Sequence, residues 1–166
     1  GRVESSQSVG VVYEGNPLES GKDYFWKVRI WDGNGHMSEY SKSASFGMGL
    51  LKQEEWKGEW LGSPSFSPDA CPMFRKEFSL QKPVKKARAY ITALGYYELR
   101  LNGNKVGEHV LDPGWTDTKK RVLYSTYDVS EALHNGSNAI GVILGTGWNS
   151  STHFNTPHAA LQFILQ

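Results

Sequence analysis

Several signatures of common protein classes are absent from this 166-residue sequence. The single cysteine, Cys71, excludes an internal disulfide and a metal site built from thiolates. No apolar run reaches the roughly 20 residues of a membrane-spanning helix, and no signal peptide opens the chain. No phosphate-binding glycine motif follows a predicted strand, and no nucleophile elbow is present. The absence of a long apolar run leads us to expect no membrane segment. The net charge of +1 implies no basic face for nucleic acid, so we expect no nucleic-acid partner.

The composition and the short-range patterns favour an all-β chain. Aromatic residues make up 13% of the sequence, and 18 glycines are typical of a chain with many turns. The only helical signal, over 128–136, has room for about one turn. We therefore predict β-strands throughout, joined by turns.

The first part of the chain contains predicted strands over 8–13 and 24–31, and a further strand that reaches about Phe46. In the second of these, Tyr24, Trp26, Val28 and Ile30 share one face, which we expect to belong to a hydrophobic core. The Asp-Gly-Asn-Gly sequence at 32–35 predicts a hairpin turn.

The stretch YFWKVRIWDGNGHMSEYSKSASFGMG resembles the latter half of a fibronectin type III domain. The resemblance covers roughly residues 8–48. A complete domain of this class has about seven strands, whereas only about four fit here. The resemblance therefore implies either that the front of the sandwich is missing or that these strands pack on the segment that follows.

A central hairpin gives the clearest local signal. Over 98–102, charged and polar residues alternate with Leu99 and Leu101, the pattern of a half-buried strand. Asn102-Gly103 tolerates positive φ at both central turn positions and predicts a tight hairpin. The return leads to Asp-Pro-Gly-Trp-Thr-Asp at 112–117, a turn with an indole between two carboxylates, which we call the DPGWTD turn.

Further strands are expected around this hairpin, over 73–80, 84–93, 121–127, 138–144 and from 161 onward. The segment 138–144 is so apolar that we expect it to be buried on both faces. With the hairpin they number six or seven, against about eight in a jelly-roll sandwich. The count predicts that the C-terminal end of this sandwich is also incomplete.

Two kinds of chemistry are open to the DPGWTD turn. Asp112 and Asp117 could form the carboxylate pair of a glycosidase, but little apolar material other than Trp115 is present to raise one pKa. The simpler interpretation is that Asp112 binds backbone amides in a turn. His153 and His158 form only a weak metal pattern.

Carbohydrate binding is the alternative, since aromatic faces contact sugar rings while carboxylates and amides bind hydroxyl groups. Calcium often accompanies such sites, bound through oxygen ligands. The tryptophans could equally be packing residues. The candidate sugar-binding residues are Asp112, Trp115, Asp117, Trp148, Asn149 and Asn155.

From Trp56 onward the sequence is similar to the N-terminal β-sandwich region of bacterial α-L-rhamnosidases. The matching pieces are WKGEWLGSP, MFRKEFSL, ARAYITALGYYELRLNGNKVGEHVLDPGWTDTKKRVLYSTYDV and NAIGVILGTGW. The resemblance implies a parent that hydrolyses terminal α-L-rhamnosides with inversion. It also implies that the catalytic acids lie in an (α/α) barrel outside this chain, which we expect as a partner domain, in a bacterial periplasmic or extracellular enzyme.

The resemblances and the patterns together predict three regions. We expect a partial fibronectin type III-like sandwich over 1–50, a linker over 51–72 and a jelly-roll, galactose-binding-like sandwich over 73–166. The predicted role is that of a non-catalytic accessory region, which supports the catalytic barrel or binds L-rhamnose-containing glycans. A purely structural spacer without sugar binding is the alternative.

Overall fold

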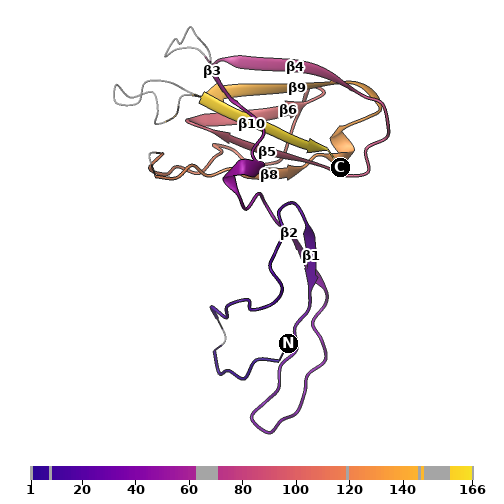
Figure 1. Ribbon diagram of the computed structural model, residues 1–166, viewed down its shortest axis with the longest axis vertical. Helices are drawn as coiled ribbons and strands as arrows, with labels where there is room; N and C mark the ends of the chain where they lie inside the picture. Colours follow the sequence, from indigo (N-terminus) through magenta and orange to yellow (C-terminus); the bar gives the residue numbers. More distant parts are fainter. Residues whose placement is uncertain are drawn as a thin grey trace. The chain divides into compact units, whose positions relative to one another are not determined.

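The computed structural model describes residues 2–7, 9–62, 71–118, 120–145 and 147, and the backbone of 158–165 (Figure 1). The chain divides into two compact units, Gly1–Glu55 and Trp56–Gln166. The described elements are β-strands and two single-turn 3-10 helices, η1 (Gln53–Glu55) and η2 (Ser130–Ala132). The predicted all-β class is therefore confirmed. No helix in these ranges is long and apolar enough to cross a membrane.

The first unit contains one antiparallel pair, β1 (Asp23–Trp26) and β2 (Ala44–Gly47). Beyond β1 the chain turns back at the predicted hairpin, where Trp31 and Met37 form an isolated bridge. The Asp32 carboxylate accepts hydrogen bonds from the backbone amides of Asn34 (2.9 Å) and His36 (2.8 Å). These bonds satisfy amides that the turn leaves unpaired.

Two expectations for this unit are wrong. Residues 9–13 form no strand, and their apolar side chains are exposed. The predicted core face is also open, with Ile30 68% and Trp26 52% exposed. An alternating pattern specifies which side chains share a face, but burial needs a second layer. Among the described residues of this unit, a two-stranded ribbon is the only sheet.

The second unit is a β-sandwich of two four-stranded antiparallel sheets. One sheet has the order β3 (Trp60–Gly62), β10 (His158–Leu165), β5 (Ala87–Ala93) and β8 (Ser125–Asp128). The other has the order β4 (Met73–Leu80), β9 (Gly136–Gly145), β6 (Tyr96–Leu101) and β7 (Asn104–Lys105). Strand β3 lies within the segment 51–72 that we expected to be a linker, and it pairs with β10.

The core lies between the two sheets and is built from alternate residues of neighbouring strands. Leu99 and Leu101 of β6 are buried as their alternation predicts. Strand β9 differs from the expectation, because only one face is fully buried while the other is half-buried. The largest fully buried side chains are Tyr90, Ile91, Leu99, Leu101, Val129, Val142 and Leu144.

The predicted Asn-Gly hairpin is confirmed, and it connects β6 to β7. Asn102 (φ +51°) and Gly103 (φ +85°) occupy the two positive-φ positions of the turn. The Asn102 side chain also accepts a hydrogen bond from the Ala139 amide (2.8 Å) and donates one to the Ala132 carbonyl (2.8 Å). A single asparagine thus joins the hairpin to the chain on either side of the η2–β9 connection.

Candidate functional site

The DPGWTD turn is anchored to the edge of the sandwich by its first residue. The Tyr97 amide of β6 donates a hydrogen bond to the Asp112 carbonyl (2.9 Å), and the two residues form an isolated antiparallel bridge. Leu111, just before this bridge, has a φ of +61°, which is uncommon for a residue with a side chain. The peptide bond that follows, between Asp112 and Pro113, is cis. The hydrogen bond and the bridge hold the start of the turn beside β6 at Tyr97.

The carboxylate of Asp112 binds side chains from two other parts of the unit. Its Oδ2 accepts hydrogen bonds from the Tyr127 hydroxyl (2.5 Å) and the Ser125 hydroxyl (3.2 Å), both on β8. The same oxygen lies 3.1 Å from Nδ1 of His109. The Asp112 side chain is only 19% exposed. Its carboxylate therefore holds the turn against β8, a role different from the backbone-amide contact expected for it.

Two tyrosines complete this cluster. The Tyr97 hydroxyl lies 3.2 Å from that of Tyr127, and Tyr97 is 7% exposed. Burial raises the pKa of the Tyr97 hydroxyl well above its usual value. The pKa of Tyr127 is raised by burial and by its hydrogen bond to the Asp112 carboxylate. Both hydroxyls are therefore neutral near pH 7 and available as donors.

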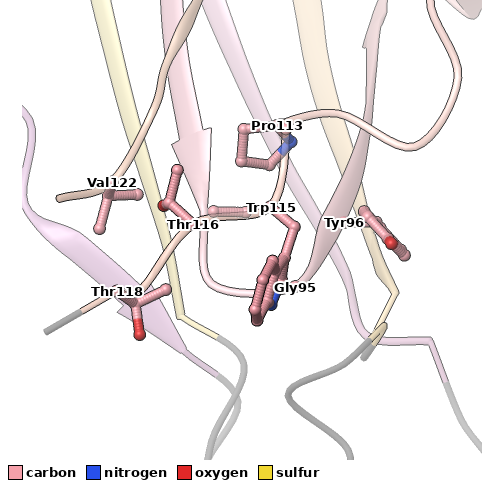
Figure 2. A pocket seen from close by; sticks show the side chains of 9 residues that line it. Gly95, Tyr96, Pro113, Trp115, Thr116, Thr118 and Val122 are labelled. Atoms are coloured by element: carbon pink, nitrogen blue, oxygen red, sulfur yellow. The ribbon is translucent and has the colours of Figure 1, made fainter.

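Trp115, at the apex of the turn, is 75% exposed. Figure 2 shows its side chain over the turn at Gly95, with Tyr96 to one side and Thr118 and Val122 to the other. The hollow lined by these residues has a volume of only about 20 Å³, close to the space of one water molecule. A sugar cannot be enclosed here, so any ring would have to lie on the exposed indole.

Asp117, at the far end of the turn, has a different environment from Asp112. Its backbone carbonyl accepts hydrogen bonds from the amides of Lys120 (2.9 Å) and Arg121 (3.0 Å). Its carboxylate is 55% exposed and lies 3.6 Å from the Lys120 ammonium. The Thr116 hydroxyl closes the same loop by donating to the Arg121 carbonyl (2.5 Å). One carboxylate of the turn is thus sheltered among side chains, and the other faces solvent.

The remaining candidate residues, Trp148, Asn149 and Asn155, lie outside the described residues. Gly147, immediately before them, is described and has a φ of +51°. A Cβ at this position would come within 2.7 Å of the Tyr96 ring. Gly147 therefore lies against the Tyr96 ring, and Tyr96 also lines the Trp115 hollow.

Sequence reasoning missed several residues of this site. The hydrogen-bonding residues Ser125 and Tyr127 lie two apart on a predicted strand, so a shared face was predictable, but their proximity to Asp112 was not. Thr116 and Thr118, beside Trp115, place hydroxyl groups at the hollow. Within the described ranges, no three His, Cys, Asp or Glu residues cluster as metal ligands.

A second, larger groove lies between the β7 hairpin and η2. Its volume is about 440 Å³, within the range of small-molecule sites. It has an apolar floor that includes Leu101 and Val129, with Lys105, Asp128 and Glu131 among its charged residues. No aromatic side chain is among its described lining residues, so it lacks the flat face on which a sugar ring would pack.

Two family models match the chain, one in each unit. Residues 82–163 match the alpha-L-rhamnosidase N-terminal domain, and residues 1–52 match the Rha78A-like, N-terminal immunoglobulin domain. Immunoglobulin and fibronectin type III domains share the β-sandwich architecture, so the second match has the architecture expected for this part of the chain. The fold and the matches define a β-sandwich region from the N-terminal side of a carbohydrate-active enzyme family.

Curated relatives agree with the family models. An alpha-L-rhamnosidase from Formosa agariphila is 38% identical over 170 residues, covering 89% of this chain and 18% of the relative. One from Alteromonas sp. is 39% identical over 159 residues, covering 90% of this chain and 17% of the relative. The chain thus spans less than a fifth of the length of these relatives. It belongs to the α-L-rhamnosidase family and matches that family's N-terminal region.

Solved structures have the same fold. An α-L-rhamnosidase from Dictyoglumus thermophilum superposes with a TM-score of 0.80 and 42% identity, covering 93% of this chain and 20% of that one. One from Aspergillus terreus gives a TM-score of 0.81 and 33% identity, over 99% of this chain and 22% of that one. A Streptomyces avermitilis α-L-rhamnosidase complexed with L-rhamnose shares the fold, with a TM-score of 0.84 and 20% identity, over 98% of this chain and 33% of that one.

Proposed function

We propose that this chain is a non-catalytic region of an α-L-rhamnosidase that hydrolyses terminal α-L-rhamnosides with inversion. In this proposal an (α/α) barrel elsewhere in the parent carries the acid and the base that inversion requires. The environment of Asp112 supports a non-catalytic role, because its carboxylate is occupied by the Tyr127 and Ser125 hydroxyls. The purified 166-residue chain should not turn over an aryl α-L-rhamnoside, and measurable turnover would overturn this assignment.

We further propose that the second unit binds L-rhamnose on the exposed face of Trp115. The observation that carries this proposal is an indole 75% exposed on a turn that is held by the partly buried Asp112 carboxylate. Exposing a large aromatic side chain on a rigid turn favours contact with the apolar face of a sugar. Thr118 lies beside it and carries a hydroxyl for polar contacts. Trp148, Asn149 and Asn155 are proposed as further contacts to the sugar. Asp117 is proposed as another sugar contact, and calcium as a cofactor of the same site.

The strand order supports assignment of the sandwich to the jelly-roll class. Successive strands from β3 to β10 are divided between two four-stranded sheets, so that β3 lies beside β10 and β4 lies beside β9. Eight strands in two sheets are typical of jelly rolls, several of which are lectin domains.

Titration calorimetry tests the binding proposal. The chain is titrated with L-rhamnose in the presence of calcium or of a chelator, and binding heat is expected at millimolar sugar or below. Trp115→Ala should abolish the heat, whereas Trp26→Ala, at an indole 52% exposed in the first unit, should leave it unchanged. Loss of binding on chelation would assign a calcium-dependent site. Absence of heat for the unmodified chain would contradict sugar binding.

A structural spacer is the second candidate function. Val110 and Leu111, close to Trp115 along the chain, are 74% and 65% exposed. Three large apolar side chains within six residues favour packing against another domain. In the full-length parent, Val110→Ser should then lower the melting temperature, while it should leave rhamnose binding by the 166-residue chain unchanged. Light scattering of the isolated chain should detect association through the same apolar residues.

A further inference from the structure

The first unit contains an alternating stack of cations and aromatic rings, which we call the cation–ring stack. The Lys27 ammonium lies 4.3 Å from the centroid of the Tyr40 ring. The Arg29 guanidinium lies 4.5 Å from the same ring and 5.0 Å from that of Trp31. The Arg2 guanidinium lies 4.8 Å from the Trp31 ring. The order along the stack is therefore Lys27, Tyr40, Arg29, Trp31, Arg2.

Local backbone pairing explains how the stack forms. Lys27, Arg29 and Trp31 are two residues apart, and the period of an extended chain places them on one face. The returning segment runs alongside, because the Ser41 amide donates to the Val28 carbonyl at 2.7 Å. Tyr40 is thereby brought over the same face. The stack thus occupies the face opposite Trp26, Val28 and Ile30.

Two of the three cations of the stack, Lys27 and Arg29, have no ion pair among the described residues. The ring contacts are the only interactions of the Lys27 and Arg29 side chains within the described part of the chain, and the Nε of Arg29 is buried without a hydrogen-bond partner. Arg2 has one exposed ion pair with Glu4, at 3.9 Å. A buried donor without an acceptor is rare in folded proteins, and the rings hold it in place without competing for its N–H groups.

We propose that the cation–ring stack binds the oxyanion groups of an acidic polysaccharide. Because Nε of Arg29 is buried, its two Nη groups are the ones placed to donate two parallel hydrogen bonds to a carboxylate or sulfate, and the rings hold the guanidinium plane in position. An acidic polysaccharide presents such groups at intervals along a chain, so one polymer can meet several cations of the stack. This site lies in the first unit and is independent of the rhamnose site proposed for the second.

The charge of the surrounding unit favours this ligand over a nucleic acid. Residues 1–55 contain six Lys and Arg against eight Asp and Glu. A net acidic unit repels a nucleic acid, with one phosphate charge per nucleotide, more strongly than a polysaccharide with sparser charges. The stack is instead a small positive site, suited to a polymer with charges spaced one or more sugars apart.

Affinity electrophoresis of the 166-residue chain tests the proposal. Native gels contain polygalacturonate as a carboxylate polymer, dextran sulfate as a sulfate polymer, or neutral dextran. We expect retardation at low salt by at least one acidic polymer and not by dextran, and the two acidic gels distinguish carboxylate from sulfate recognition. Retardation by neither acidic polymer would overturn the proposal.

Matched variants locate the site. The double variant K27Q/R29Q should weaken the apparent affinity by about tenfold or more, because charge-assisted hydrogen bonds are lost. The double variant K82Q/K85Q removes two exposed lysines of the second unit and should have no effect, although its net charge is the same. Equal weakening by both pairs would overturn the assignment to the stack. R29K retains the positive charge but lacks the paired N–H donors of the guanidinium. Unchanged affinity for this folded variant would exclude bidentate recognition.

Discussion

Tyr127 donates a hydrogen bond to the Asp112 carboxylate across 2.5 Å and so joins β8 to the DPGWTD turn. Tyr127→Phe removes this donor from a sheltered carboxylate. We expect the free energy of unfolding to fall by about 1–3 kcal/mol, measured by urea denaturation.

Tyr96→Phe is the matched control, because Tyr96 is on β6 of the opposite sheet, beside Tyr97, and no hydrogen bond of its hydroxyl is found among the described residues. It should change the free energy of unfolding by no more than about 0.5 kcal/mol. Equal effects of the two substitutions would show that the Tyr127–Asp112 hydrogen bond does not contribute to the free energy of unfolding.

The buried tyrosine Tyr97 should make the second unit sensitive to alkali. Burial raises the pKa of its hydroxyl in the folded chain above the value of about 10 that it has when unfolded. Above pH 10 the unfolded chain therefore binds fewer protons than the folded chain, and stability falls as pH rises. The contribution of Tyr97 should approach about 1.4 kcal/mol per pH unit.

Urea denaturation at pH 8, 10 and 11 measures this loss. Tyr97→Phe lacks the titrating hydroxyl, so its stability should decline less steeply above pH 10 than that of the unmodified chain. Parallel curves for the two proteins would contradict a raised pKa at this position.

Two glycines of the central region should differ in their tolerance of alanine. Gly103 and Gly107 both have positive φ, so alanine costs about 1 kcal/mol of backbone strain at each. At Gly107 the added Cβ would also lie 2.6 Å from the Tyr127 ring, whereas at Gly103 it meets open space.

Gly107→Ala should therefore lower the free energy of unfolding by roughly 1–3 kcal/mol more than Gly103→Ala. Thermal unfolding of the two variants side by side provides the comparison. Equal losses for the two variants would contradict this prediction and would mean that the Tyr127 ring moves away at no cost.

The two Asn-Gly sequences of the second unit should deamidate at different rates in the folded chain. In this reaction the glycine nitrogen attacks the asparagine Cγ, ammonia leaves, and water opens the resulting succinimide. At Asn135 the side chain is exposed, and its Oδ1 lies 3.1 Å from the Gly136 nitrogen. At Asn102 the side chain is held by the Ala139 amide and the Ala132 carbonyl.

Peptide mass spectrometry after incubation at pH 8 should find aspartate and isoaspartate at Asn135 before Asn102. In denaturant the hydrogen bonds of Asn102 are lost, and the two rates should become equal. Faster reaction at Asn102 in the folded chain would contradict the protection that its hydrogen bonds predict.

The hairpin at Asn102 was predictable because its determinants are local. Alternation places Leu99 and Leu101 in the core, and Asn-Gly accepts the two positive φ values that a tight turn needs. The same rules place Trp115 in a turn, where sugar contact and packing were both open. Local chemistry therefore predicted the frame of the candidate site and the position of Trp115 in it, but not the 75% exposure of its side chain.

The binding partners of Asp112 could not be predicted in the same way. Ser125 and Tyr127 are 13 and 15 residues away in sequence and lie in the other sheet from β6, which the turn borders. No spacing rule connects a turn to a strand of the opposite sheet. The prediction that Trp26 and Ile30 lie in a core was wrong for a related reason. An alternating pattern specifies which side chains share a face, but not whether another layer covers that face.

The pairing of β3 with β10 determines how the sandwich responds to mechanical load. The strands are antiparallel, with Trp60 opposite Ala160, so the start of β3 and the end of β10 lie at the same end of the pair. A force that separates these two points acts on the hydrogen bonds one after another rather than all together. Because β5 holds β10 from Ala159 to Leu165, β3 should detach first, at low force, while the remaining strands stay paired.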